Sequence, residues 1–236
     1  MKLSNRLEML ISFVENTETA ADIGTDHAHV PVELVRRGIV KRAYAMDVRK
    51  GPLSRAKEHI AAAGLGAQIE TRLSDGLDKL KAGEAHAVII AGMGGELMIH
   101  ILEAGSHILD SVDQWVLSPH SEIPKVREWL CRHGFPIVKE AMVYEDGKYY
   151  TILDVRKQGS GVLDAENDFR YGMYQKKEKN PVFWDYLKEE ERKLTVIREN
   201  LSVQAEHSEK AKESLLEVEK KLAANREVQH EMQGDH

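Results

Sequence analysis

The chain has 236 residues, of which 42% are hydrophobic, and a formal net charge of −6. No apolar run approaches the roughly 18 to 20 residues needed to cross a bilayer, so the composition excludes a membrane-spanning protein and predicts one sizeable domain plus something smaller. The negative charge argues against a protein that coats nucleic acid. Contacts with nucleic acid would have to come from local basic patches, whose other interpretation is solvated helix ends.

The N-terminal stretch indicates where the protein is located, and the single cysteine limits disulfide, thiol and metal chemistry. The stretch MKLSNRLEMLISFV is too polar for a signal peptide, which predicts a cytoplasmic protein. Cys131 has no second cysteine to pair with and is expected to be a buried bystander rather than a nucleophile. No metal site is expected, because His27 and His29 would point to opposite sides of an extended loop.

Strand-like and helix-like segments alternate from residue 5 to 133, which predicts a parallel sheet with helices on both faces. Strands are expected at 19–23, 43–47, 68–73, 87–91 and 114–118, and helices at 4–15, 30–37, 51–63, 75–81, 95–109 and 122–133. Two further strand-like runs follow, separated by the hairpin signal Asp146-Gly147. Crossover units closed by an antiparallel hairpin predict an α/β fold, the seven-stranded, Rossmann-like sheet of class I methyltransferases.

The rest of the chain predicts a helical C-terminal domain. The domains are expected at 1–158, with a polar connector over 159–180 and a coiled coil over 181–233. In the last segment apolar residues recur at seven-residue spacing, as from Leu187 to Leu194 and Leu201. A polar gap at Ser208 favours two helices folded back on each other in an antiparallel pair, and therefore a monomer. One continuous helix that dimerises is the alternative.

Acidic residues and glycines follow the predicted strands at their carboxyl ends, where ligands bind in doubly wound sheets. The expected cofactor-binding residues are Asp22, Gly24, Asp26, His27, Asp47, Asp75, Gly76, Ala91, Gly92, Met93 and Gly94. Carboxylates at this place would repel a pyrophosphate, so the ligand is expected to be cationic or neutral, and an NAD-dependent dehydrogenase is disfavoured. S-adenosyl-L-methionine meets this requirement, since its amino group and sulfonium are positive and it carries no phosphate.

Two of these carboxylates have specific expected roles. Asp47 is expected to accept hydrogen bonds from both ribose hydroxyls of the cofactor, and Asp75 or the amide of Gly76 to meet the exocyclic amine of the adenine. The alternative for each aspartate is the cap of the helix that follows it. Gly92, Gly94 and Gly95 would permit a flat base to approach the backbone closely, and the alternative for them is a tight turn with an unobstructed helix start.

Six stretches together resemble the TrmK family of bacterial tRNA (adenine-N1)-methyltransferases: LSNRL, ADIGTDHAHVP, IAGMGGELMIHILEAG, REWL, EDGKYY and KEKNPVF. The similarity runs from about residue 3 to 187, and the coiled coil also resembles the family's C-terminal domain. The resemblance implies that S-adenosyl-L-methionine is used to methylate N1 of adenine 22 in tRNA. Two departures concern the wall of the target-base pocket: His29 stands where many relatives have tyrosine, and SPHSE stands where some have Gln-Pro-Asn.

The chemistry of N1 agrees with the loop after the fourth strand, AGMGG, which lacks the Pro-Pro-aromatic arrangement of exocyclic-amine methylases. N1 has an unprotonated lone pair, so the main demand is to stabilise the positive charge that develops on the ring. Asp26 is the candidate, and its alternative role is to bind the methionine amino group. Asp26, His29 and Met93 are the predicted catalytic residues, with His29, Met93 and His120 as candidates to contact a base extruded from its stack.

Contacts with the rest of the tRNA are expected from basic residues. Arg6 on the first helix is placed to meet the flanking phosphates, with a surface salt bridge as the alternative. Lys176, Lys177 and Lys179 are the candidates beside the coiled coil. Two other functions stay open at this point: a methyltransferase for another RNA or a small molecule, and a non-catalytic coiled-coil adaptor.

Overall fold

A computed structural model describes residues 3–157 and 166–234 of the chain, which divides into two compact units, Met1–Asp164 and Ala165–His236. The first unit contains α1 (Asn5–Phe13), β1 (Thr17–Ile23), α2 (His29–Arg36), β2 (Val40–Asp47), α3 (Lys50–Ala62), β3 (Ile69–Leu73), β4 (Ala87–Met93), α4 (Gly95–Ala104), the 3-10 helix η1 (Leu109–Ser111), β5 (Gln114–Pro119), α5 (Ile123–Arg132), β6 (Ile137–Glu145) and β7 (Lys148–Arg156). The second contains α6 (Glu166–Tyr171), α7 (Met173–Lys177), α8 (Pro181–Ala205) and α9 (Glu209–Gln233).

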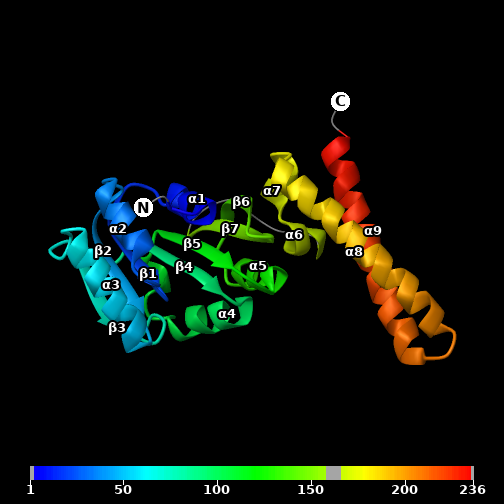
Figure 1. The fold of residues 1–236 in the computed structure, drawn as a ribbon, viewed down its shortest axis with the longest axis horizontal. Helices are drawn as coiled ribbons and strands as arrows, with labels where there is room; N and C mark the ends of the chain where they lie inside the picture. Colours follow the sequence, from blue (N-terminus) through cyan, green and yellow to red (C-terminus); the bar gives the residue numbers. More distant parts are fainter. Residues whose placement is uncertain (1–2, 158–165, 235–236) are drawn as a thin grey trace. The chain divides into compact units, whose positions relative to one another are not determined.

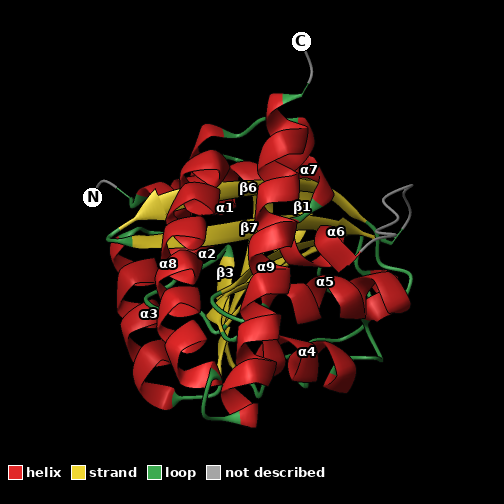
Figure 2. Cartoon of the chain, turned by 90° about the vertical axis from the view of Figure 1, so that its right-hand side faces the viewer, coloured by secondary structure: helices red, strands yellow, loops and turns green. Residues whose placement is uncertain are grey.

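The strands of the first unit form one seven-stranded sheet in the order β3-β2-β1-β4-β5-β7-β6. Strands β1 to β5 are parallel, and β7 pairs antiparallel with both β5 and β6. Figure 1 shows this sheet flanked by its helices, and Figure 2 draws the strands in yellow. The predicted α/β fold of class I methyltransferases is confirmed, including the hairpin at Asp146-Gly147, where both residues have positive φ.

The parallel strands are buried on both faces, as their continuous apolar runs predict. Ala87, Val88, Ile89 and Ile90 of β4 are each no more than 1% exposed. Helices α1, α2 and α3 contribute to one core cluster with the sheet, while α4 and α5 pack against each other. Strands β2 and β3 follow on one side of β1, and the chain then returns to place β4 on its other side. At such a point in a doubly wound sheet, a crevice opens at the carboxyl ends of the two neighbouring strands.

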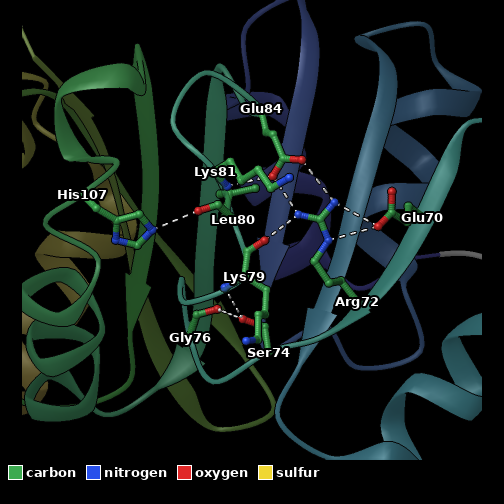
Figure 3. Close-up of polar contacts among 9 residues, drawn as sticks. All are labelled: Glu70, Arg72, Ser74, Gly76, Lys79, Leu80, Lys81, Glu84 and His107. Carbon is green, nitrogen blue, oxygen red and sulfur yellow. Dashed lines mark hydrogen bonds and ion pairs between the residues drawn. The ribbon is translucent and has the colours of Figure 1, made fainter.

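The predicted helix over 75–81 is wrong, because Asp75 forms a bend and residues 76–79 form a turn. Side chains from outside the segment occupy the backbone groups that a helix would use. The hydroxyl of Ser74 donates to the carbonyl of Gly76 and accepts from the amide of Lys79, at 3.0 and 3.1 Å. Arg72 donates to the carbonyl of Lys79 and His107 to that of Leu80, at 2.7 and 3.0 Å (Figure 3). These hydrogen bonds from outside the segment outweigh its helix propensity.

The predicted helix over 95–109 is too long, since α4 ends at Ala104. Gly105 follows as the C-cap, and a Cβ there would lie 2.2 Å from Leu77 Cδ1. The chain therefore turns closely over the buried Leu77 before the 3-10 helix begins. No helix in 3–157 or 166–234 combines the length and the apolar character that a membrane span requires.

In the second unit, α8 and α9 form an antiparallel pair rather than one continuous helix. The break falls at Glu206–His207, and Ser208 caps α9 by accepting a hydrogen bond from the amide of Ala211. Leu194, Val218 and Leu222 form the shared apolar seam.

The described part of the segment expected as a connector, 166–180, contains α6 and α7. Residues 159–165 lie outside the described residues. The buried Tyr171 donates to Glu190 at 2.7 Å, and the Lys176 ammonium lies 2.8 Å from Asp168 and 3.2 Å from Glu231. These polar pairs tie the two short helices to α8 and α9, which is why a polar sequence here does not form a free linker.

Candidate active site

The acidic residues expected at the strand ends meet in one crevice. Asp22 lies near the end of β1 beside Ala45 of β2 and Ile89 of β4, and Asp47 is the last residue of β2. Both carboxylates are buried, with 8% and 5% of their surface exposed. Parallel pairing places these strand ends side by side, as the sequence predicts.

A cavity of about 420 Å³ opens above these carboxylates. It is bounded by α1, the turn after β1, the start of α2, the segment after β2, and the ends of β4 and β5. The lining residues include nine of the predicted site residues: Arg6, Asp22, Gly24, Asp26, His29, Asp47, Ala91, Gly92 and His120. This space is named the first cavity below.

A second cavity of about 310 Å³ adjoins the first and shares Gly24, Asp47, Arg49, Ala91 and Gly92 with it. Its own lining residues are Ile23, Val48, Ser74, Asp75, Gly76, Met93, Leu97 and Ile101. This lining combines polar groups with large apolar side chains, which suits a flat heterocycle with an edge amine. The adenine predicted near Asp75 and Gly76 would therefore lie in this second cavity.

Burial controls the ionisation of the crevice floor. It raises the pKa of Asp22 to about 6, and the nearby Asp47 carboxylate acts in the same direction. Asp47 Oδ1 accepts the backbone amide of Arg49 at 2.7 Å. A buried carboxylate whose ionised form is disfavoured gains most from a cation bound beside it. A diphosphate would instead add negative charge to the same space, so these residues fit a cationic ligand.

The turn after β1 is held in a left-handed conformation. Gly24 has a φ of +75°, and both its amide and that of Thr25 donate to the Met46 carbonyl at 2.8 Å. His27 and Ala28 also have positive φ, at 57° and 54°. Left-handed backbone costs residues with a Cβ about 1 to 2 kcal/mol each. Strain of this kind at a ligand crevice is typical of turns whose side chains must point in a fixed direction.

Asp26 projects from this turn into the first cavity, with its side chain 73% exposed. Arg55 of α3 faces it, with Nη2 3.6 Å from Asp26 Oδ1. His29 lines the cavity from the start of α2, and burial, followed by the neighbouring His59 and His27, holds the pKa of its imidazole below 6.5. His29 is therefore a neutral ring at pH 7.

Arginines surround the acidic floor of the first cavity. Arg6, Arg49 and Arg55 come from three separate parts of the chain and all line it. Arg6 donates to His120 Nε2 at 3.1 Å, and its guanidinium lies 5.0 Å from the Tyr150 ring centre. The cavity thus joins a negative floor to a positive rim, and a positive rim attracts phosphates.

Several predicted residues lie elsewhere. His27 and Gly94 line neither cavity in the described part of the chain; His27 packs on His29, and Gly94 is the N-cap of α4. Lys176, Lys177 and Lys179 belong to the second unit. Lys177 and Lys179 are exposed, whereas the Lys176 ammonium is engaged by Asp168 and Glu231.

Ten lining residues are not among the predicted site residues: Leu7, Leu10, Ile23, Val30, Val48, Arg49, Arg55, Ser74, Leu97 and Ile101. One signal was available, because Val48 and Arg49 directly follow the expected strand end at Asp47. Leu97 remains 52% exposed and Val48 57%, which is unusual for large apolar side chains that line a cavity. Such exposure becomes visible only after the fold is known.

Comparison with known proteins gives the family. The family model described as "Methyltransferase domain" matches residues 3–153. The tRNA (adenine(22)-N(1))-methyltransferase of Bacillus subtilis (strain 168) is 35% identical over 235 residues, which cover 97% of each chain.

Solved structures agree in fold over nearly the whole chain. The B. subtilis m1A22 tRNA methyltransferase TrmK has a TM-score of 0.87 at 34% identity, covering 96% of this chain and 98% of that one. M. capricolum TrmK in complex with the natural cofactor product S-adenosyl-homocysteine has a TM-score of 0.85 at 27% identity, covering 98% of this chain and 100% of that one. The chain therefore belongs to the tRNA (adenine(22)-N1)-methyltransferase family of methyltransferases, as its sequence motifs predict.

Proposed function

We propose that this protein transfers a methyl group from S-adenosyl-L-methionine to N1 of adenine 22 in tRNA. The observation that carries the proposal is the pairing of two features in one crevice: a buried acidic floor at Asp22 and Asp47, and an arginine rim at Arg6, Arg49 and Arg55. The floor suits a cationic methyl donor and the rim suits the phosphates of an RNA. The relatives named above, which act on adenine 22 of tRNA, support the same substrate.

One molecule of the cofactor would extend across both cavities. S-adenosyl-L-methionine, when bound, supplies an electrophilic methyl group on a positively charged sulfur. Asp47 would hold the ribose hydroxyls, since its second carboxylate oxygen remains available while Oδ1 accepts the Arg49 amide. Val48 and Leu97 would flank the adenine, and Asp75 with Gly76 would meet its amine. Asp22 would face the methionine end, where positive charge offsets the unfavourable burial of its carboxylate.

The target base would enter the first cavity. Adenine N1 lies on the Watson–Crick edge, so the base must leave its stack before it can react. Arg6 is held at the entrance by His120 and Tyr150 and would bind a phosphate beside the extruded nucleotide. His29 and His120 present neutral rings on which the base can stack.

Asp26 would stabilise the charge that develops on the ring. N1 needs no general base because its lone pair lies in the ring plane and carries no proton. As the methyl group is transferred, the adenine becomes a cation, and a carboxylate held beside the ring lowers the energy of that state. Asp26 lines the first cavity on an ordered turn, which meets the requirement for a preorganised charge.

The proposal is tested with a labelled methyl donor and unmodified tRNA transcripts that carry either adenine or guanine at nucleotide 22. Methylation of N1 in the adenine transcript alone, mapped by mass spectrometry, is the expected result. Asp26→Asn is expected to lower turnover more than tenfold while the dissociation constant for tRNA stays within twofold. Methylation at another nucleotide, or of another RNA in preference, would replace the proposed substrate.

A further inference from the structure

Helix α3 contacts the turn that carries Asp26 through two side chains that lie one helical turn apart. His59 Nδ1 donates to the carbonyl oxygen of His27 at 2.7 Å. Arg55 Nε donates to His27 Nε2 at 3.2 Å, and Arg55 Nη2 lies 3.6 Å from Asp26 Oδ1. His59 therefore contacts the backbone of the turn next to the first cavity, and Arg55 contacts its side chains.

This turn depends on contacts from outside. His27 and Ala28 have φ values of 57° and 54°, a region that residues with a Cβ rarely adopt. Ala28 is the N-cap of α2 and offers no side-chain cap to its first turn. Without a partner for the His27 carbonyl, the backbone would relax toward ordinary φ values and turn Asp26 away from the cavity.

The imidazole of His59 also contacts the ring of His29. The ring of His29 packs against His27 with centroids 5.6 Å apart and an interplanar angle of 21°. Its centroid lies 4.9 Å from that of His59, at an interplanar angle of 63°. In the described part of the chain His59 does not line the first cavity, so its influence on Asp26 is indirect.

We propose that His59 is a positioning residue for methyl transfer, which holds the Asp26 turn in its reactive conformation through the His27 carbonyl. The inference rests on the proposed function, in which Asp26 stabilises the methylated base. A carbonyl oxygen only accepts, so His59 Nδ1 carries the hydrogen in this contact.

Two substitutions separate the hydrogen bond from packing. His59→Asn places an amide nitrogen near the position of Nδ1 and keeps a donor, whereas His59→Leu keeps apolar bulk and removes it. We expect His59→Leu to lower kcat at least fivefold and His59→Asn to stay within twofold of the unaltered protein. A matched control is His133→Leu, because His133 Nδ1 also donates to a backbone carbonyl, that of Trp129 at 2.8 Å, beyond the last turn of α5. The control should leave kcat within twofold.

A double variant shows whether His59 acts through Asp26. If it does, Asp26→Asn combined with His59→Leu turns over within twofold of Asp26→Asn alone, because the group that His59 positions has already lost its charge. A further fivefold loss in the double variant would overturn the inference. So would a kcat of His59→Leu that equals that of the unaltered protein, or a failure of His59→Asn to restore it.

Hydrogen exchange tests, without any substrate, whether His59 holds the Asp26 turn in place. Amides in peptides covering 24–33 are expected to exchange at least fivefold faster in His59→Leu than in His59→Asn, in the absence of tRNA. Equal exchange in the two variants overturns the inference even if adenine 22 is methylated. If His59→Leu exchanged faster but the unaltered protein did not methylate adenine 22, His59 would still be the residue that holds the turn, and only the proposed function would be wrong.

Discussion

Arg6 and His120, 114 positions apart in the chain, are joined by a 3.1 Å contact between Arg6 Nη1 and His120 Nε2 at the edge of the first cavity. An arginine has no acceptor, so His120 must accept at Nε2 and carry its own hydrogen on Nδ1. Burial, then the charges of Arg6 and Lys148, hold the pKa of His120 below its ordinary value of 6.5. The neutral ring thus fixes a cation at the place where the RNA is expected to enter.

Arg6→Ala is expected to raise the dissociation constant for tRNA about fivefold, because one phosphate contact is lost. The dependence of binding on salt should weaken by about one counterion, whereas affinity for S-adenosyl-L-methionine stays within twofold. Filter binding at several salt concentrations and titration calorimetry measure the two quantities. Arg132→Ala on the exposed end of α5 is the control. An unchanged salt dependence in Arg6→Ala would remove this arginine from the RNA interface.

Asp22 predicts opposite effects of pH on cofactor binding and on stability. Its folded pKa of about 6 lies above the ordinary 3.8, so the folded protein takes up a proton as the pH falls through 6. The apo protein therefore gains stability from this group between pH 7 and pH 4, while the cationic cofactor loses its anionic partner. Affinity for S-adenosyl-L-methionine should be about tenfold weaker at pH 5 than at pH 7.

Asp22→Asn is the matched variant for this effect, since it removes the titration and keeps the shape. Calorimetric titrations at pH 5, 6 and 7 should show that the affinity of Asp22→Asn for S-adenosyl-L-methionine hardly changes with pH. Thermal unfolding of the apo variant should not show the gain in stability that the unaltered protein shows as the pH falls. The same pH dependence in the variant and the unaltered protein would assign the titration to another group.

Much of the fold follows from local patterns, and the exceptions have identifiable causes. The apolar run of β4 and the Asp146-Gly147 turn are encoded within a few residues, which is why both are correctly predicted. The helix expected at 75–81 fails because Arg72 and His107 bond to its backbone from outside (Figure 3). Information of that kind is absent from any short window of sequence.

The candidate site shows the same division. Asp22 and Asp47 are recognisable because each ends an apolar strand, and the topology alone brings such ends together. Of the three arginines of the rim, Arg6 is predicted as a phosphate contact. Arg49 and Arg55 could equally be solvated charges on a helix, and only the fold shows that both line the first cavity. The orientation of a charged helix face is a tertiary property, so the full positive rim does not follow from the sequence.

Asp47→Ala is expected to weaken S-adenosyl-L-methionine binding at least 30-fold. The substitution removes the acceptor proposed for the ribose hydroxyls, and the loss of a single hydrogen bond to a charged group already costs about 2 kcal/mol. Asp113→Ala, at an exposed position before β5, should leave the affinity unchanged. Titration calorimetry measures both. If Asp47→Ala bound the cofactor as tightly as the control, Asp47 would serve only as the partner of the Arg49 amide.

Gly24→Ala should disrupt the crevice at its centre. Gly24 has a φ of +75°, and a Cβ there would lie 2.1 Å from Met93 Cε. The methionine, which lines the second cavity, would have to move, and the backbone strain of about 1 kcal/mol remains. Cofactor affinity is expected to fall more than tenfold. Gly66→Ala is the control, because a Cβ there meets open space; equal affinity in the two variants would contradict the assignment of Gly24.

Removal of residues 165–236 is expected to separate cofactor binding from tRNA binding. The described residues that line both cavities belong to the first unit, so affinity for S-adenosyl-L-methionine should stay within twofold. Affinity for tRNA should fall at least tenfold, since the exposed Lys177 and Lys179 are lost.

A double charge reversal, Lys177→Glu with Lys179→Glu, tests this in the full chain and should weaken tRNA binding by at least fivefold. Lys212→Glu on the exposed side of α9 is its control. Lys176 is not included, because its ammonium already pairs with Asp168 and Glu231, and reversing it would destabilise the second unit. If the truncated protein bound tRNA as tightly as the full chain, the arginine rim of the first cavity alone would account for recognition of the RNA.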